Sequence, residues 1–350
     1  MAFAKETGWG NLPNGNFSPV IYSKQAQIAF RKAATVAAIT NSDYFGEIAN
    51  QGDTVRIIKE PEITVNTLKR GTSLATQVLN DADFQLVIDQ ANYFQFELDD
   101  IEEAHSHVDF MKMATDRAGY RLADTYDLEV LAYLCGYNAD GSVRTAPNGT
   151  KADAAAGADE LLAANKLDIT SFGNITTAGS VGDSIPVAPR FGGATAASAT
   201  TATPLQVIAR MGRLLDQRNV DTRDRWLVVD PVFVEMLKDE DSRVLNADFG
   251  GAGLQNGLVL NNLHGFRVYV SNNTVQVGTG SGTSGAAAQS TNYGVIVAGH
   301  DSAVATAEQI NKVESFRSQT NFADVVRGMH LYGRKILRPE AIVTANYNAA

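Results

Sequence analysis

The sequence contains a single cysteine, Cys135, among 350 residues. One cysteine forms no disulfide within the chain and supplies no thiolate-rich metal site. The sequence also lacks any run of 18 apolar residues, and its first residues have neither the basic start nor the apolar core of a signal peptide. These absences predict an unexported protein without a membrane segment.

Basic residues are outnumbered. The chain has 29 Lys and Arg against 39 Asp and Glu, a net charge of −10, which argues against tight sequence-specific binding of nucleic acid. The imbalance lies between Asp81 and Glu129, where 13 acidic side chains stand against Lys112, Arg117 and Arg121. This acidic block is either a solvated surface or a surface that meets a basic patch on a neighbouring chain.

Motifs for cofactor binding are weak. The segment GSGTSG at 280–285 has the spacing of a dinucleotide-binding loop, and Asp301 follows about 20 residues later. Only a short segment separates this loop from the next expected strand, which leaves no room for the helix that must hold the pyrophosphate. We therefore predict no cofactor.

The histidines do not form a metal or catalytic motif. His105 and His107 lie two residues apart on an expected helix, so they point to different sides and cannot share one ion. His264, His300 and His330 are widely separated in the sequence. An enzyme would need the fold to gather such residues in one pocket, and the sequence alone predicts no enzyme site.

The first half of the chain predicts extended elements followed by a long helix. Residues 1–50 read as an arm, and residues 52–98 read as a two-stranded hairpin with its tip near Lys69. The apolar stripe in 101–137 predicts a helix of about 35 residues, roughly 50 Å long. Because a lone hairpin of this length has no third layer to cover it, we expect another molecule to supply that cover.

The second half predicts a mixture of strands and helices. Residues 138–203 are rich in Ala, Gly, Ser and Thr and read as an insertion with one short helix. A capped amphipathic helix is expected in 203–220, and a strand in 225–229 that turns at Asp230 into a helix begun by Pro231. Further strands are expected in 265–272 and 293–299, and a final strand in 328–347, broken at Arg338–Pro339. The fold class is α+β.

The order of these segments resembles the major capsid proteins of tailed bacteriophages, which have the Hong Kong 97 fold, and most closely the podovirus-like branch. The resemblance is carried by FELDDIEEAHSHVDFMKMATDRAGYRLADTYD, RWLVVDPVFVEMLKD and NFADVVRGMHLYGRKILRPEAIVTA. It implies five parts: an N-arm at 1–50, an extended E-loop at 52–98, a peripheral domain with a spine helix from 99–137 and 310–350, an insertion at 138–203, and an apical domain at 204–309.

The resemblance also implies a function. The chain would self-assemble, as hexamers and pentamers, into an icosahedral head shell that encloses double-stranded DNA, with no catalytic activity and no cofactor. It would be assembled in the host cytoplasm and reside in the virion. Implied partners are a separate scaffolding protein, a portal protein, a possible decoration protein, and packaged DNA by weak, non-specific proximity. The alternatives are an encapsulin-like compartment shell and an enzyme with an unrecognised site.

Charge suggests which residues would steer assembly. Residues 310–350 hold six basic against three acidic side chains, so they could meet the acidic block of a neighbouring subunit. We expect that reversing the charge of the basic candidates impairs assembly and leaves subunit stability nearly unchanged. No crosslink through Lys69 is predicted, although some relatives join subunits through a lysine. The candidate interface residues are Lys69, Arg70, Glu60, Glu62, Glu102, Glu103, Arg334 and Lys335.

Overall fold

The computed structural model describes a large part of the chain. The described residues are 34–41, 54–59, 63–67, 70–71, 76–77, 82–99, 110–139, 161–172, 184–188, 201–238, 263–276, 293–318 and 322–349. Within these ranges no helix is both long enough and apolar enough to cross a membrane.

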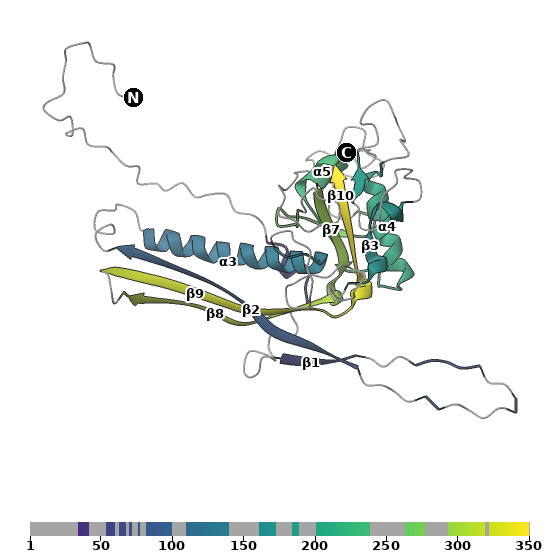
Figure 1. Ribbon diagram of the computed structural model, residues 1–350, viewed down its shortest axis with the longest axis horizontal. Helices are drawn as coiled ribbons and strands as arrows, with labels where there is room; N and C mark the ends of the chain where they lie inside the picture. The colour runs from purple at the N-terminus through teal and green to yellow at the C-terminus, as the bar shows by residue number, and fades with distance from the viewer. Residues whose placement is uncertain are drawn as a thin grey trace, which may run out of the picture.

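Two sheets and three α-helices make up the described structure (Figure 1), and the α+β class expected from the sequence is confirmed. The antiparallel four-stranded sheet has the order β1 (Thr54–Lys59), β2 (Ala82–Asp99), β9 (Ala323–Ile336), β8 (Val304–Arg317). The mixed six-stranded sheet has the order β3 (Lys166–Leu167), β10 (Ile342–Ala349), β7 (Tyr293–His300), β5 (Arg225–Val229), β6 (Arg267–Val270), and β4 (Ile185–Val187) also pairs with β10. The α-helices are α3 (Phe110–Cys135), α4 (Pro204–Gln217) and α5 (Pro231–Leu237), and 3-10 turns occur at Val36–Ala38, Ala163–Asn165, Ile169–Ser171, Asp301–Ala303 and Pro339–Ala341.

Local sequence signals explain helices α4 and α5, and both predictions are confirmed. Thr203 and Gln206 form a capping box at the start of α4, with Pro204 at its first turn. Strand β5 is followed by Asp230, whose carboxylate accepts a hydrogen bond from the backbone N–H of Phe233 at 3.3 Å and so caps α5.

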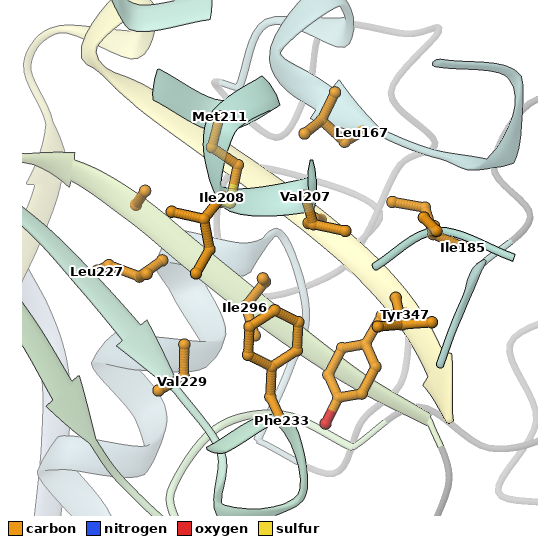
Figure 2. Packing of buried hydrophobic residues seen from close by; sticks show 14 of the residues in the cluster. Leu167, Ile185, Val207, Ile208, Met211, Leu227, Val229, Phe233, Ile296 and Tyr347 are labelled. Atoms are coloured by element: carbon orange, nitrogen blue, oxygen red, sulfur yellow. The ribbon is translucent and has the colours of Figure 1, made fainter. Parts of the chain in front are cut away.

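The six-stranded sheet is buried on both faces. Alternate residues of β5 point to opposite sides, so Leu227 and Val229 pack in one cluster, and Trp226 and Val228 pack in another. Figure 2 shows the first cluster, in which Val207, Ile208 and Met211 of α4 and Phe233 of α5 lie against the sheet. The second cluster contains the C-terminal turns of α3.

Helix α3 lies along one face of the four-stranded sheet (Figure 1). It spans 26 residues, about 39 Å at 1.5 Å per residue, where the sequence predicted a helix over 101–137. Residues 101–109, with His105 and His107, lie outside the described part. The last turns of α3, from Val130 to Cys135, are buried, and Cys135 is a core residue as expected.

The sequence missed a strand. Residues 304–317 form β8, which pairs along its length with β9 and was not assigned from the sequence. The hairpin is also less isolated than expected, because only 82–87 of β2 pair with β1, whereas Ile88 to Asp99 pair with β9 under α3. Strand β9 and helix α3 of the same chain therefore supply part of the cover that was expected from another molecule.

The pairing of strands shows which segments lie together in space. Within 138–203, which the sequence reads as an insertion, the described strands β3 and β4 pair in parallel with β10 and bury Leu167, Ile185 and Val187. The final strand was grouped with 310–336, but the break at Arg338–Pro339 lets the chain leave the four-stranded sheet, and β10 pairs with β7 in the other sheet. The grouping of the final strand assumed that neighbours in the sequence are neighbours in space.

Candidate assembly surfaces

Between β1 and β2, the described residues 63–67, 70–71 and 76–77, here called the ribbon, extend beyond the paired strands (Figure 1). The ribbon carries exposed apolar side chains. Ile63 is 67% exposed and Val65 is 92% exposed. The backbone N–H of Thr64 donates to Oε1 of Gln77 at 3.1 Å, which ties together the two sides of the ribbon. Two aliphatic residues at alternate positions of an extended segment are therefore available to a partner.

A second surface lies on the face of the four-stranded sheet opposite to α3. Residues paired directly across strands share a face, so Tyr93, paired with Met329, lies on the side opposite to His330 and Tyr332, which face α3. Tyr93 is 80% exposed, and Met329 and Phe316 are each 41% exposed. We call Tyr93, Phe316 and Met329 the open face. None of the described elements covers it (Figure 1).

Charged residues lie on the open face itself, with the cross-strand pair Glu314 and Arg327 between Met329 and Phe316. The guanidinium of Arg327 lies 4.9 Å from the ring centre of Phe316 and donates to Oε2 of Glu314 at 3.0 Å. Lys312 pairs with the same carboxylate, and these two cations lower the pKa of Glu314. Lys312 and Arg327, two of the six basic side chains of residues 310–350, are therefore held in ion pairs within the sheet.

Arg334 and Lys335, two of the sequence-predicted interface residues, do not form one patch. As consecutive residues of β9 they point to opposite faces. Arg334 faces α3, where its Nη1 donates to the backbone O of Glu129 at 2.6 Å and its guanidinium lies 5.0 Å from the ring centre of Tyr133. Lys335 is half-buried on the other face. Arg334 thus fastens α3 to the sheet.

Arg70 is exposed and precedes Gly71, whose φ of +91° suits the turn. The other predicted interface residues lie outside the described part: Lys69, Glu60, Glu62, Glu102 and Glu103.

Acidic side chains of the block between Asp81 and Glu129 are partly used inside the subunit. The carboxylate of Glu129 accepts hydrogen bonds from Nδ2 of Asn92 at 2.9 Å and from the hydroxyl of Tyr332. Burial and this carboxylate raise the pKa of Tyr332, and burial raises the pKa of Tyr126 to about 12, so both phenols stay protonated. Beside them, His330 is buried, with its Nε2 at 3.4 Å from Oε2 of Glu308. This polar layer joins α3 to the sheet.

The residues considered for an enzyme site are not gathered into one. His264 is exposed in a turn, whereas Nδ1 of His300 lies 2.9 Å from Oγ of Ser302. Asp301 accepts a hydrogen bond from Nη2 of Arg267 at 2.6 Å, which raises the pKa of Arg267. Among the residues that the structure describes, no three His, Cys, Asp or Glu side chains could hold a metal ion. The loop at 280–285 lies outside the described part.

The sequence did not single out the open face. Phe316 lies in the unassigned strand β8, and Met329 lies in a strand whose alternation is interrupted by glycines. The alternation of Tyr93 with Phe94 and Phe96 was visible, but it does not say which side α3 covers.

Comparison with known proteins gives matches only at the level of structure. No family model matches the sequence, and no curated protein matches it. A chain from Mycobacterium phage Che8 is 24% identical, with a TM-score of 0.67 over 94% of this chain and 97% of that chain. A capsid chain of cyanophage P-SCSP1u is 20% identical, with a TM-score of 0.61 over 95% and 93% of the two chains.

A chain from the mature capsid of bacteriophage PhiM1 is 15% identical, with a TM-score of 0.60 over 99% of this chain and 97% of that chain. Such coverage includes both sheets, α3 and the ribbon. The chain therefore has the Hong Kong 97 capsid fold, the fold of the tailed-bacteriophage capsid subunits that it resembles.

Proposed function

We propose that this chain is the major capsid protein of a tailed bacteriophage and assembles with copies of itself into the icosahedral head shell around double-stranded DNA. The observation that carries this proposal is the match to capsid structures over nearly the whole length of both chains. An enzyme that had reused the fold would be expected to add a pocket with catalytic side chains, and the described histidines lie apart or in structural contacts.

The two surfaces give the assembly a physical basis. The ribbon presents Ile63 and Val65, and the open face presents Tyr93, Phe316 and Met329. We propose that the ribbon of one subunit lies on the open face of the next. Such a head-to-tail contact uses two different patches of one chain, and it gives a closed shell when the rotations between copies close. Burying about 100 Å² of apolar surface at each contact would contribute about 2.5 kcal/mol, repeated around the shell.

The finer parts of the assignment belong to the same proposal. Copies would form hexamers and pentamers, aided by a separate scaffolding protein and joined by a portal protein, with a decoration protein as a possible addition. Packaged DNA would lie near the shell without specific binding, since the chain has a net charge of −10. Assembly would occur in the host cytoplasm and the product would be the virion. Membership of the podovirus-like branch stays a prediction.

Electron microscopy of the purified, assembled protein tests the proposal. Closed particles that contain DNA after expression in an infected host support a capsid, whereas particles that contain an enzyme support an encapsulin-like shell. A chain that stays a compact monomer under all assembly conditions contradicts both.

Engineered cysteines test the contact itself, because the native Cys135 is buried and will not interfere. Val65→Cys combined with Tyr93→Cys should form oxidised dimers and larger ladders on denaturing gels of assembled particles. The matched control pairs Val65→Cys with Ala123→Cys, an exposed position on the helix that covers the opposite face. If particles form but contain no crosslink between positions 65 and 93, the chain still forms a shell and the proposed contact is wrong.

A further inference from the structure

Residues 34–41, here called the strap, are held to the body of the protein like a bound peptide. Val36 and Ile39 are fully buried in the cluster that contains Leu131 and Leu134 of α3. Between these two anchors Ala37 and Ala38 are exposed. The strap is therefore held through two aliphatic side chains spaced three residues apart, together with its backbone.

The backbone of the strap is bound by one buried carboxylate. Oδ1 of Asp127 accepts the N–H of Thr35 at 2.7 Å and the N–H of Val36 at 2.9 Å. Asp127 lies in α3, 92 residues away in sequence from Thr35, and is fully buried. Burying a carboxylate costs free energy unless hydrogen-bond donors surround it. The two N–H groups therefore stabilise buried Asp127, and Asp127 in turn holds the backbone of the strap in place.

The other oxygen of the same carboxylate holds a different part of the chain. Oδ2 of Asp127 accepts a hydrogen bond from Nδ2 of Asn273 at 3.0 Å. Asn273 is buried in the turn 271–275 after β6, and this turn is bonded to the six-stranded sheet at both ends. The N–H of Ser271 donates to the O of Val229 at 3.0 Å, and the O of Val275 accepts the N–H of Val295 at 3.1 Å.

The far end of the strap is bonded to the four-stranded sheet. The N–H of Asn41 donates to the O of Val304 at 2.8 Å, and the O of Asn41 accepts the N–H of Thr306 at 3.1 Å. This single parallel bridge lies at the base of β8. The strap is therefore bonded directly to the four-stranded sheet through Asn41. Asp127 joins it to α3 and, through Asn273, to the turn that is bonded to the six-stranded sheet.

We propose that the strap is a releasable clamp whose docking is coupled to the order of turn 271–275 through Asp127. When the strap leaves, Oδ1 loses its backbone donors, and the carboxylate must reorient to find others or water. Reorientation weakens the bond from Oδ2 to Asn273, so the turn loosens. Because coupling between two sites is reciprocal, loosening the turn also weakens strap docking by the same factor. The clamp acts in the single chain, independently of shell assembly.

Hydrogen exchange measured by mass spectrometry on the full-length, unassembled chain tests the coupling. The double variant Val36→Asp/Ile39→Asp removes both aliphatic anchors and should raise exchange about tenfold or more in 34–41 and also in 271–276, while α4 is unchanged. The matched control Ala37→Asp/Ala38→Asp introduces the same charge at the two exposed positions of the strap and should leave both segments unchanged. Unchanged exchange in 271–276 after the strap is loosened overturns the proposal.

Faster exchange in α4 would show that the double variant unfolds. In that case a second variant, at Asn273, tests the coupling in the opposite direction. Asn273→Ala removes the amide that donates to Oδ2 of Asp127 and also, at 2.9 Å, to Oδ1 of Asp124. It should raise exchange at the amides of Thr35 and Val36, although neither residue touches Asn273 in any hydrogen bond found in the structure. Strap amides that exchange as slowly as in the wild type would refute the coupling, whether or not the protein forms shells.

Discussion

The ring of Phe94 occupies the space that a side chain at Gly328 would need. The two residues are directly paired across β2 and β9, and a Cβ built on Gly328 would overlap the ring atoms of Phe94. Phe94 also stacks on Phe96, with ring centres 6.2 Å apart. The glycine therefore permits a row of aromatic rings on the face of the sheet that α3 covers.

Gly328→Ala should destabilise the subunit, because the new methyl group must displace Phe94 from its place beside Phe96. We expect the free energy of unfolding to fall by about 1–3 kcal/mol, measured by urea denaturation. Gly119→Ala is the matched control, since Gly119 is exposed in α3 with nothing within 4 Å of a built Cβ. That change should stabilise by about 0.5–1 kcal/mol. Equal effects of the two substitutions would show that the Phe94 contact is unimportant.

Asp230 should make stability depend on pH in an unusual direction. Burial raises its pKa above the ordinary value of 3.8, against the opposing effect of its hydrogen bond from Tyr347. The folded state then keeps its proton to a higher pH than the unfolded state, so the contribution of this group to stability is full below about pH 4 and is lost as the pH rises through the raised pKa. Asp230→Asn removes this titration.

The measurement is the difference in unfolding free energy between wild type and Asp230→Asn, followed by urea denaturation from acid to neutral pH. It should decrease with rising pH and then level off. Asp221→Asn provides a control of opposite sign, because the backbone N–H of Arg223 lowers the pKa of the exposed Asp221, whose contribution is lost as the pH falls. A difference for Asp230 that rises with pH would contradict the assignment.

Arg334→Glu should destabilise the folded subunit, in contrast to the expectation that charge reversal there affects assembly alone. The substitution removes the hydrogen bond to the O of Glu129 and the contact with Tyr133, at a cost of about 2–3 kcal/mol. Arg338→Glu, at an exposed position four residues on, should change stability by no more than about 0.5 kcal/mol. Thermal unfolding of the two variants distinguishes a structural arginine from a surface one, and similar melting temperatures would refute the structural role.

Asn165 should be sensitive to loss of its amide hydrogens. Its buried Nδ2 donates to the backbone O of Ile342 at 2.9 Å and lies 3.2 Å from the O atoms of Pro339 and Glu340. Asn165→Asp places a carboxylate against these carbonyls and should cost about 3 kcal/mol or more. Asn219→Asp is the control, because Asn219 is exposed with a φ of 57°, which aspartate tolerates. Denaturation curves that coincide for the two variants would show that the hydrogen bonds from Asn165 to residues 339–342 do not stabilise the fold.

Local signals made part of the fold predictable. The capping residues Thr203 and Gln206 predict the start of α4. Pro231, which follows a run of β-branched residues, predicts the end of β5 and the start of α5. Strands β3 and β4 could not be found in this way, because two or three residues become a strand only when β10 offers an edge. Likewise, a periodic pattern identifies a strand face, but only the position of α3 shows that Tyr93 is left uncovered and Arg334 is not.

The place of β10 in the six-stranded sheet has a consequence for synthesis on the ribosome. This strand pairs with β3, β4 and β7, and the chain reaches it only after making every other described element. A nascent chain therefore carries α4, β5 and β7 with an unfilled place beside β7 until residues 342–349 emerge. Contacts so distant in sequence close slowly, so the growing chain exposes the apolar edge of β7 until β10 has been made. Protection by cellular chaperones at that stage would matter more for the yield of this protein than the stability of its finished fold.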